Sequence, residues 1–245
     1  NRKHLLTFFF FFLPQLPALF IDGESGRSYT YNDVRDLSTQ FGQGLIHNFG
    51  WQKGDVLAFF TLNSIDTPVV NLGLHWAAGV ASPANPTYTV EELARQLKDA
   101  GAKALVTQTP FLDASRRAAK LAGLPEDRII LLGEGRDSRF QHWRDITAEK
   151  AWFKPKKPSI DPSKDLAYLV YSSVSLKHPG EPKIGPFSSP LPFAYTYFLQ
   201  GTTGLPKGVM LYHSNIVANT VQTYRFDPRG LTWDADVQLG VLPFF

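Results

Sequence analysis

The chain has 245 residues, of which 43% are hydrophobic and 19% are charged, and its formal net charge at pH 7 is +3. This composition places it among globular proteins, with enough residues for a buried core in one large or two small domains. It contains no cysteine, which excludes disulfides, thiolate metal sites and thiol catalysis and is compatible with a reducing compartment.

The first 18 residues carry a short apolar run, Leu5–Leu13, after a basic start. The run is too short to span a bilayer, which needs about 20 residues. Its length suits the apolar part of a signal peptide, but no small-residue cleavage pattern follows. We therefore interpret residues 1–18 as an aberrant or unstructured segment, and we expect no integral membrane segment in the chain.

From residue 19 onward, strand and helix patterns alternate. Apolar segments bounded by glycines at 19–22 and 28–30 predict a hairpin. The patterns that follow predict strands at 56–62, 80–82, 104–107 and 129–132, and helices at 31–49, 65–78, 90–100 and 111–122. This alternation predicts an α/β fold with a largely parallel sheet flanked by helices.

Local signals mark the ends of two of these helices. Thr30 and Asp33 resemble an N-terminal capping arrangement, although Asp is a weaker partner than Glu at that position. Thr89 and Glu92 form the full capping-box pattern. The segment 85–89 between a strand and a helix is interpreted as a structural turn rather than a ligand contact.

Two groups of polar residues have structural interpretations. His47, His75 and His142 show no metal-ligand spacing, so we expect surface or core histidines. The basic cluster of Lys154, Lys156 and Lys157 is interrupted by prolines. It indicates a solvated linker rather than a nucleic-acid surface, and we expect no nucleic-acid partner and no protein-held metal.

Residues 161–165 form a predicted turn that leads into an apolar strand ending in Ser172 and Ser173. A segment with five prolines, residues 174–200, follows this strand. Its composition is typical of a linker or irregular loop. A native functional loop is one interpretation. Our preferred interpretation is a translated intron, because Val174-Ser175 and Gln200 match what in-frame splice-site sequences would encode.

The segment Gly201-Thr202-Thr203-Gly204-Leu205-Pro206-Lys207-Gly208 combines glycines, hydroxyl groups and one lysine. Glycine permits positive φ and lets the backbone approach a ligand closely. Successive backbone N–H groups in such a turn bind anions, and Lys207 adds a charge for phosphate oxygens. The spacing is not that of a Walker A loop. An ordinary turn before the strand at 209–212 is the structural alternative.

This segment and the residues around it resemble the phosphate loop of the adenylate-forming enzymes, which include acyl-CoA synthetases, luciferases and peptide-synthetase adenylation domains. In that superfamily two serines directly precede the glycine-rich loop, and here Ser172 and Ser173 match them once residues 174–200 are removed. The segment ANPTYTVEEL at residues 84–93 is similar to the 4-coumarate–CoA ligase branch. The resemblance extends over residues 19–245, interpreted as a partial AMP-binding domain interrupted by 174–200.

The resemblance implies an ATP-dependent carboxylic acid–CoA ligase that forms an acyl-adenylate and then a thioester. It implies ATP, Mg²⁺ and coenzyme A as cofactors or substrates, with an aryl or fatty acid as the other partner. Lys207 would be the catalytic cation, and His213 would be structural. The residues implied to cradle the phosphates are Ser172, Ser173, Gly201, Thr202, Thr203, Gly204 and Lys207.

Departures from the family pattern limit these expectations. The insert separates the serines from Gly201, and the superfamily's later motifs are absent, with only the start of the next one present at 242–245. We therefore expect the chain as written to be a truncated, inactive portion of a ligase. The alternative is a non-catalytic nucleotide-binding or interaction module on the same fold. A cytoplasmic or a peroxisomal location would suit the family, and the sequence does not decide between them.

Overall fold

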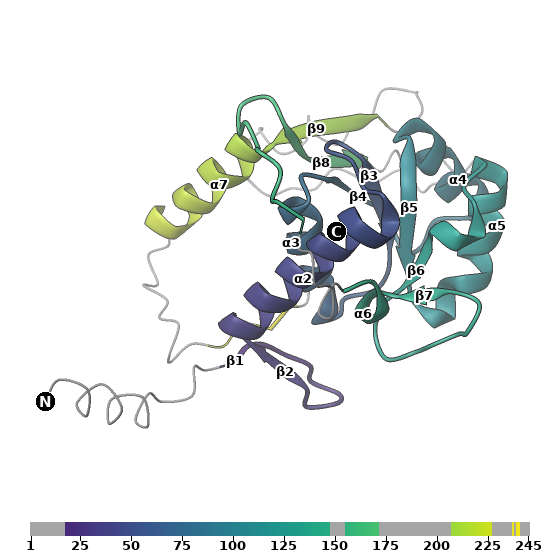
Figure 1. The fold of residues 1–245 in the computed structure, drawn as a ribbon, viewed down its shortest axis with the longest axis horizontal. Helices are drawn as coiled ribbons and strands as arrows, with labels where there is room; N and C mark the ends of the chain where they lie inside the picture. The colour runs from purple at the N-terminus through teal and green to yellow at the C-terminus, as the bar shows by residue number, and fades with distance from the viewer. Residues whose placement is uncertain (1–17, 148–154, 172–206, 227–236, 238, 241–245) are drawn as a thin grey trace, which may run out of the picture.

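The computed structural model describes residues 18–147, 155–171, 207–226, 237 and 239–240. Within these ranges a seven-stranded sheet has the order β7-β6-β5-β3-β4-β8-β9, and a separate hairpin contains β1 and β2. Helices cover both faces of the large sheet (Figure 1). The predicted α/β fold with a largely parallel sheet is confirmed. The N-terminal segment before residue 18 and the insert 174–200 lie outside the described residues.

The chain enters through the predicted hairpin, in which β1 (Ala18–Ile21) runs antiparallel to β2 (Ser28–Thr30). Helix α2 (Tyr31–Phe49) begins directly after β2. Its capping box is complete, because Thr30 Oγ1 accepts the Asp33 N–H while the Asp33 carboxylate accepts the Thr30 N–H. The helix ends where Gly50 adopts a left-handed backbone with φ 65°, a conformation that glycine reaches without a Cβ penalty.

Parallel strands form the centre of the sheet, as predicted. Strand β3 pairs with β4 on one side and β5 on the other, and β6 continues outward from β5. Their bounds are β3 (Val56–Phe60), β4 (Val80–Pro83), β5 (Ala102–Thr107) and β6 (Ile129–Leu131), and the crossover helices are α3 (Asp66–Trp76), α4 (Val90–Asp99) and α5 (Leu112–Ala122). Two single-turn 3₁₀ helices, η1 (Thr109–Phe111) and η2 (Glu126–Arg128), flank α5.

Three short or late elements were not predicted from the sequence. Strand β7 (Gln141–His142) and helix α6 (Trp143–Ile146) follow β6, and helix α7 (His213–Phe226) follows directly after β9. The two predicted strands that flank the glycine-rich segment are present as β8 (Leu166–Tyr171) and β9 (Gly208–Tyr212). Strand β8 is parallel to β4, whereas β9 is antiparallel to β8 at the edge of the sheet.

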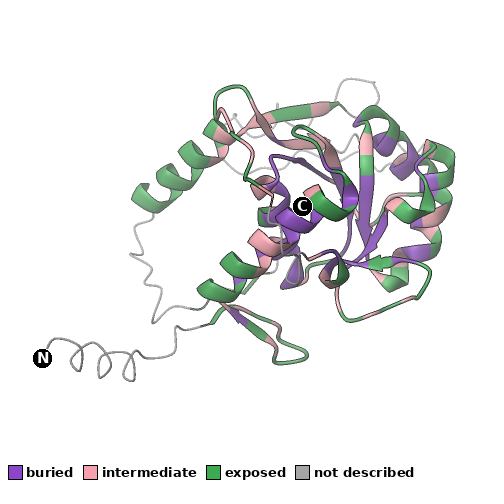
Figure 2. Ribbon diagram, viewed as in Figure 1, coloured by how far each residue is buried: buried purple, intermediate pink, exposed green. Residues whose placement is uncertain are grey.

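The core has two layers because alternate side chains of a strand point to opposite faces of the sheet. Leu57 and Phe59 of β3 pack into the layer formed with α2 and α3, whereas Ala58 and Phe60 pack into the layer formed with α4 and α5. The central strands are buried on both faces, while α7 has no buried residue (Figure 2). None of the helices in the described ranges is both long and apolar enough to cross a bilayer.

Candidate functional site

The carboxyl edge of the parallel strands is the candidate site, because ligands of open α/β sheets bind at that edge. Strand β8 ends there at Tyr171, the residue before Ser172. Strand β9 begins there at Gly208, the residue after Lys207, and Tyr171 and Gly208 are register partners. The two ends of the predicted phosphate segment are therefore adjacent, and the exposed Lys207 lies beside them.

Most of the predicted phosphate cradle lies outside the described residues. This applies to Ser172, Ser173, Gly201, Thr202, Thr203 and Gly204. The structure thus gives the position of Lys207 and of the strand ends on either side of the segment. Residues that hold these two strand ends were not identified by the sequence analysis.

A side-chain hydrogen bond links the segments that follow the carboxyl ends of β3 and β5. Chain connections diverge at this point, since β3 leads to β4 on one side and β5 leads to β6 on the other, which makes it a common place for a ligand. Here Gln108, directly after β5, bridges the two segments, because its Oε1 accepts the Leu62 N–H at 2.9 Å.

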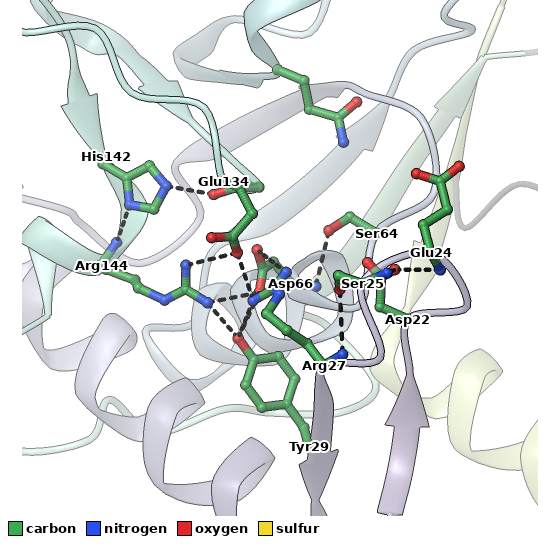
Figure 3. Close-up of polar contacts among 12 residues, drawn as sticks. Asp22, Glu24, Ser25, Arg27, Tyr29, Ser64, Asp66, Glu134, His142 and Arg144 are labelled. Carbon is green, nitrogen blue, oxygen red and sulfur yellow. Dashed lines mark hydrogen bonds and ion pairs between the residues drawn. The ribbon is translucent and has the colours of Figure 1, made fainter.

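An ionic cluster around the buried Asp66 occupies the part of the edge near the hairpin (Figure 3). Asp66, at the start of α3, is fully buried and accepts the Tyr29 hydroxyl at 2.6 Å. Arg27 and Arg144 also contact its carboxylate, at 3.5 and 3.3 Å. Glu134 lies 2.9 Å from Arg27 and 3.7 Å from Arg144. Two guanidinium groups thus face two carboxylates, and the cluster is electrically compensated.

This ionic cluster has a structural role, because it joins the hairpin, α3, the loop after β6 and α6. Burial, together with the hydrogen bond to Asp66, raises the pKa of Tyr29, so the phenol stays protonated and continues to donate. Sequence reasoning missed the cluster. Tyr29 and Asp66 are 37 residues apart and Arg144 follows 78 residues after Asp66, so no local pattern indicates the contact.

A small, mostly apolar pocket lies between the carboxyl ends of β3 and β4. The Thr67 hydroxyl in its wall is buried and has no hydrogen-bond partner within the described residues. Beside this pocket, Asn63 Nδ2 donates to the carbonyl of Gly240 at 3.2 Å. The chain just before the motif start at 242–245 therefore crosses the same edge. The pocket is lined by Phe59, Thr61, Leu62, Asn63, Thr67, Asn71, Ala81 and Pro83.

The histidines have the structural positions that were expected. His47 is exposed, whereas His75 and His142 lie in the interior. His142 Nε2 contacts the Gly133 carbonyl at 2.7 Å. The predicted structural residue His213, which starts α7, packs edge to face against His75 with ring centroids 5.3 Å apart.

The basic and acidic residues of the described ranges give no second candidate site. Lys156 and Lys157 are exposed, while Lys154 of the same cluster lies outside those ranges. No group of three or more His, Asp or Glu side chains that could hold a metal ion is present among the described residues.

Comparison with known protein families identifies the chain's family. The model of the AMP-binding enzymes matches residues 13–175 and 188–245. The chain belongs to the AMP-binding enzyme family. The match breaks at residues 176–187, within the segment 174–200 that the sequence analysis treats as an insert. This family membership confirms the resemblance to adenylate-forming enzymes.

Individual relatives agree with the family assignment. The chain is 30% identical over 228 residues to 4-coumarate–CoA ligase-like 1 of Arabidopsis thaliana, covering 92% of this chain and 35% of the relative. The chain thus spans about a third of the length of the curated relatives it matches. Its fold is similar to the luciferase-like enzyme of the mealworm Zophobas morio, with a TM-score of 0.61, 23% identity and coverage of 84% of this chain and 41% of that one. An anthranilate CoA ligase solved with anthranoyl-AMP gives a TM-score of 0.62 at 22% identity, covering 84% of this chain and 34% of that one.

Proposed function

We propose that this chain supplies the phosphate-binding edge of an ATP-dependent carboxylic acid–CoA ligase. The observation that carries the proposal is the pairing of Tyr171 with Gly208. This pairing brings together the residues on either side of the predicted phosphate segment. The exposed Lys207 lies next to it at the carboxyl edge. The similarity to 4-coumarate–CoA ligases supports an aryl acid as substrate, and fatty acids are the second class to assay.

The chemistry would consist of attack by a carboxylate on the α-phosphorus of ATP, with loss of pyrophosphate to give an acyl-adenylate. The coenzyme A thiol would then attack the acyl carbon, forming the thioester and releasing AMP. Negative charge builds on the leaving phosphates, and preorganised N–H groups, hydroxyls and a cation stabilise that charge best where water is excluded. Lys207 would supply the cation. The hydroxyls would come from Ser172, Ser173, Thr202 and Thr203. When bound, Mg²⁺ would neutralise part of the phosphate charge.

We also propose that residues 174–200 are an insert within the AMP-binding domain. The break in the family match at 176–187 supports this. Because loop-closure free energy rises by only about 0.6 kcal/mol per doubling of loop length, the pairing of β8 with β9 tolerates the insert. A phosphate cradle is more demanding, since a displacement of about 1 Å can reduce the rate ~100-fold. The insert is either a translated intron or a native loop. Transcripts that read through both edges of the segment without a splice junction would argue for the native loop.

Nucleotide binding tests the role of Lys207. We expect Lys207→Ala to weaken ATP binding by about tenfold to a hundredfold, the range for a charged hydrogen bond, in the 245-residue chain and in a version without Val174–Gln200. Binding is measured by titration with a fluorescent ATP analogue. Lys103→Ala is the matched control, because Lys103 is an exposed lysine near the start of β5, at the opposite edge of the sheet. Equal affinities for Lys207→Ala and the unmodified chain would contradict the proposal.

We expect the 245-residue chain by itself to form no CoA ester, because it spans about a third of its relatives' length. ATP–pyrophosphate exchange and thioester formation with hydroxycinnamic, benzoic and long-chain acids measure this. Turnover above the Lys207→Ala background would overturn the expectation. Nucleotide binding without turnover would agree with it, and would also fit a module that binds nucleotide without catalysis.

A further inference from the structure

The end of strand β8 extends beyond its pairing with the rest of the sheet. Strand β4 pairs with β8 at one position, Ala81↔Tyr168. The pairing of β8 with β9 continues three residues further, to Tyr171↔Gly208. In the described part of the chain, the ladder to β4 therefore does not hold the strand ends that carry the predicted phosphate segment.

Two tyrosines of β8 reach helices on opposite faces of the sheet. Residues three apart on a strand point to opposite sides. The Tyr168 hydroxyl donates to Asn71 Oδ1 of α3 at 3.1 Å, and the Tyr171 hydroxyl donates to Asp99 Oδ2 at 2.5 Å. Asp99 is the last residue of α4. The strand is thus held from both faces, and the Tyr171 contact lies at its very end.

The Tyr171 ring also lies against the first residue of β9. A Cβ placed on Gly208 would be 3.3 Å from Tyr171 Cζ, 3.4 Å from its hydroxyl oxygen and 3.0 Å from Leu169 Cδ1. The ring therefore covers the backbone directly after Lys207. Burial, and then the hydrogen bond to Asp99, raise the pKa of Tyr171, so the phenol remains a donor at neutral pH.

We propose that Tyr171 and Asp99 are a positioning pair that holds the first residue of β9, and with it Lys207, at a fixed place beside the carboxyl end of β8. This inference rests on the proposed function, because it gives the pair a role in nucleotide binding. The pair acts through Gly208 and does not itself contact nucleotide. Its effect follows from geometry: Lys207 can serve a phosphate only while its backbone is held in register.

Hydroxyl removal tests the pair in the 245-residue chain. We expect Tyr171→Phe to weaken binding of a fluorescent ATP analogue about threefold to tenfold, the range for one lost hydrogen bond. Asp99→Leu should have the same effect, and the double variant no more than either one. Asp99→Asn keeps an oxygen acceptor and should restore affinity close to that of the unmodified chain. Tyr168→Phe is the matched control, since it removes a tyrosine hydrogen bond from the same strand without touching Gly208, and it should leave affinity unchanged.

Amide hydrogen exchange separates this inference from the proposed function. Tyr171→Phe should speed exchange in the backbone of β9, and Tyr168→Phe should do so much less. If Lys207→Ala does not change nucleotide affinity, or the unmodified chain binds no nucleotide, the proposed function fails and exchange alone decides whether the pair holds β9. The inference is overturned if Tyr171→Phe leaves exchange in β9 unchanged, or if Tyr168→Phe matches Tyr171→Phe in both measurements.

Discussion

At the scale of single residues, packing against neighbouring rings favours the neutral form of two histidines. His75 in α3 packs edge to face against the rings of Tyr168 and His213. Burial, with a smaller effect of the nearby His213, lowers the pKa of His75 from 6.5 to about 4. His213 itself has a lowered pKa, which burial causes in the first place, while Asp165 opposes the shift and Lys157 adds to it. Both imidazoles are therefore neutral partners in a packed cluster.

This arrangement predicts a loss of stability on acidification. Below pH 6.5 an unfolded His75 takes up a proton, whereas the folded one does so only near pH 4. The free energy of unfolding should therefore fall as the pH drops from 6.5 toward 4, with about 2–3 kcal/mol of the loss due to His75. Urea unfolding at about pH 7 and about pH 4.5 measures the difference.

His75→Phe is the informative variant for this prediction, because it keeps an aromatic ring and removes the titrating group. Its unfolding free energy should depend less on pH by that amount. Some dependence should remain, since His142 and His213 also have lowered pKa values. Equal pH dependence in the variant and the unmodified chain would show that His75 is not the group that titrates.

At the scale of elements, glycines set how closely helices approach one another. A Cβ on Gly42 of α2 would lie 2.6 Å from the carbonyl oxygen of Gly73 in α3 and 2.8 Å from a Trp76 ring atom. A hydrogen bond crosses the same contact, from Ser38 Oγ to the Val69 carbonyl at 2.9 Å. The two helices could not keep this separation with a larger residue at Gly42.

The close approach predicts whether Gly42→Ala stabilises or destabilises the fold. Helix propensity favours the substitution, whereas packing opposes it. Alanine favours a helix over glycine by about 1 kcal/mol, but overpacking a close contact typically costs about 1–3 kcal/mol. Because backbone atoms cause the clash, we expect Gly42→Ala to destabilise the fold by about 1–2 kcal/mol, measured by urea unfolding. Gly23→Ala is the control, since a Cβ there meets nothing within 4 Å. A stabilised Gly42→Ala variant would mean that the helices separate at little cost.

At the scale of the whole molecule, helix α7 beside β9 is exposed along its length (Figure 2), and several of its exposed side chains are apolar. Val217 and Val221 of α7 are 61% and 47% exposed. Tyr224 and Phe226, near the end of the helix, are each 83% exposed. Exposed apolar side chains gathered on one helix favour association.

We therefore expect the 245-residue chain to self-associate at concentrations on the order of 10 μM. Replacing both Val217 and Val221 with glutamate should reduce association, as measured by sedimentation velocity. Leu121→Glu is the matched control, because Leu121 of α5 is 52% exposed and lies on the other layer of helices. A chain that stays monomeric at ten times that concentration would contradict the prediction.

The accuracy of the sequence predictions depended on how local the signal was. The capping pairs at Thr30 and Thr89 were recognised because both partners of each lie within three residues, and both helices begin where predicted. Strand β7 and helix α6 are too short to show a period. Helix α7 was missed because it starts at His213, directly after β9, without a turn signal between them.

The same difference between local and long-range signals applies to the candidate site. The sequence identified the family and predicted the residues of the phosphate segment, because the glycines, threonines and lysine of that segment are contiguous. Long-range packing alone pairs Tyr171 with Gly208, brings Asp99 to Tyr171 from 72 residues away, and places two half-buried arginines on the buried Asp66. Such contacts depend on how the whole chain packs, and no short-range pattern of polarity or spacing encodes them.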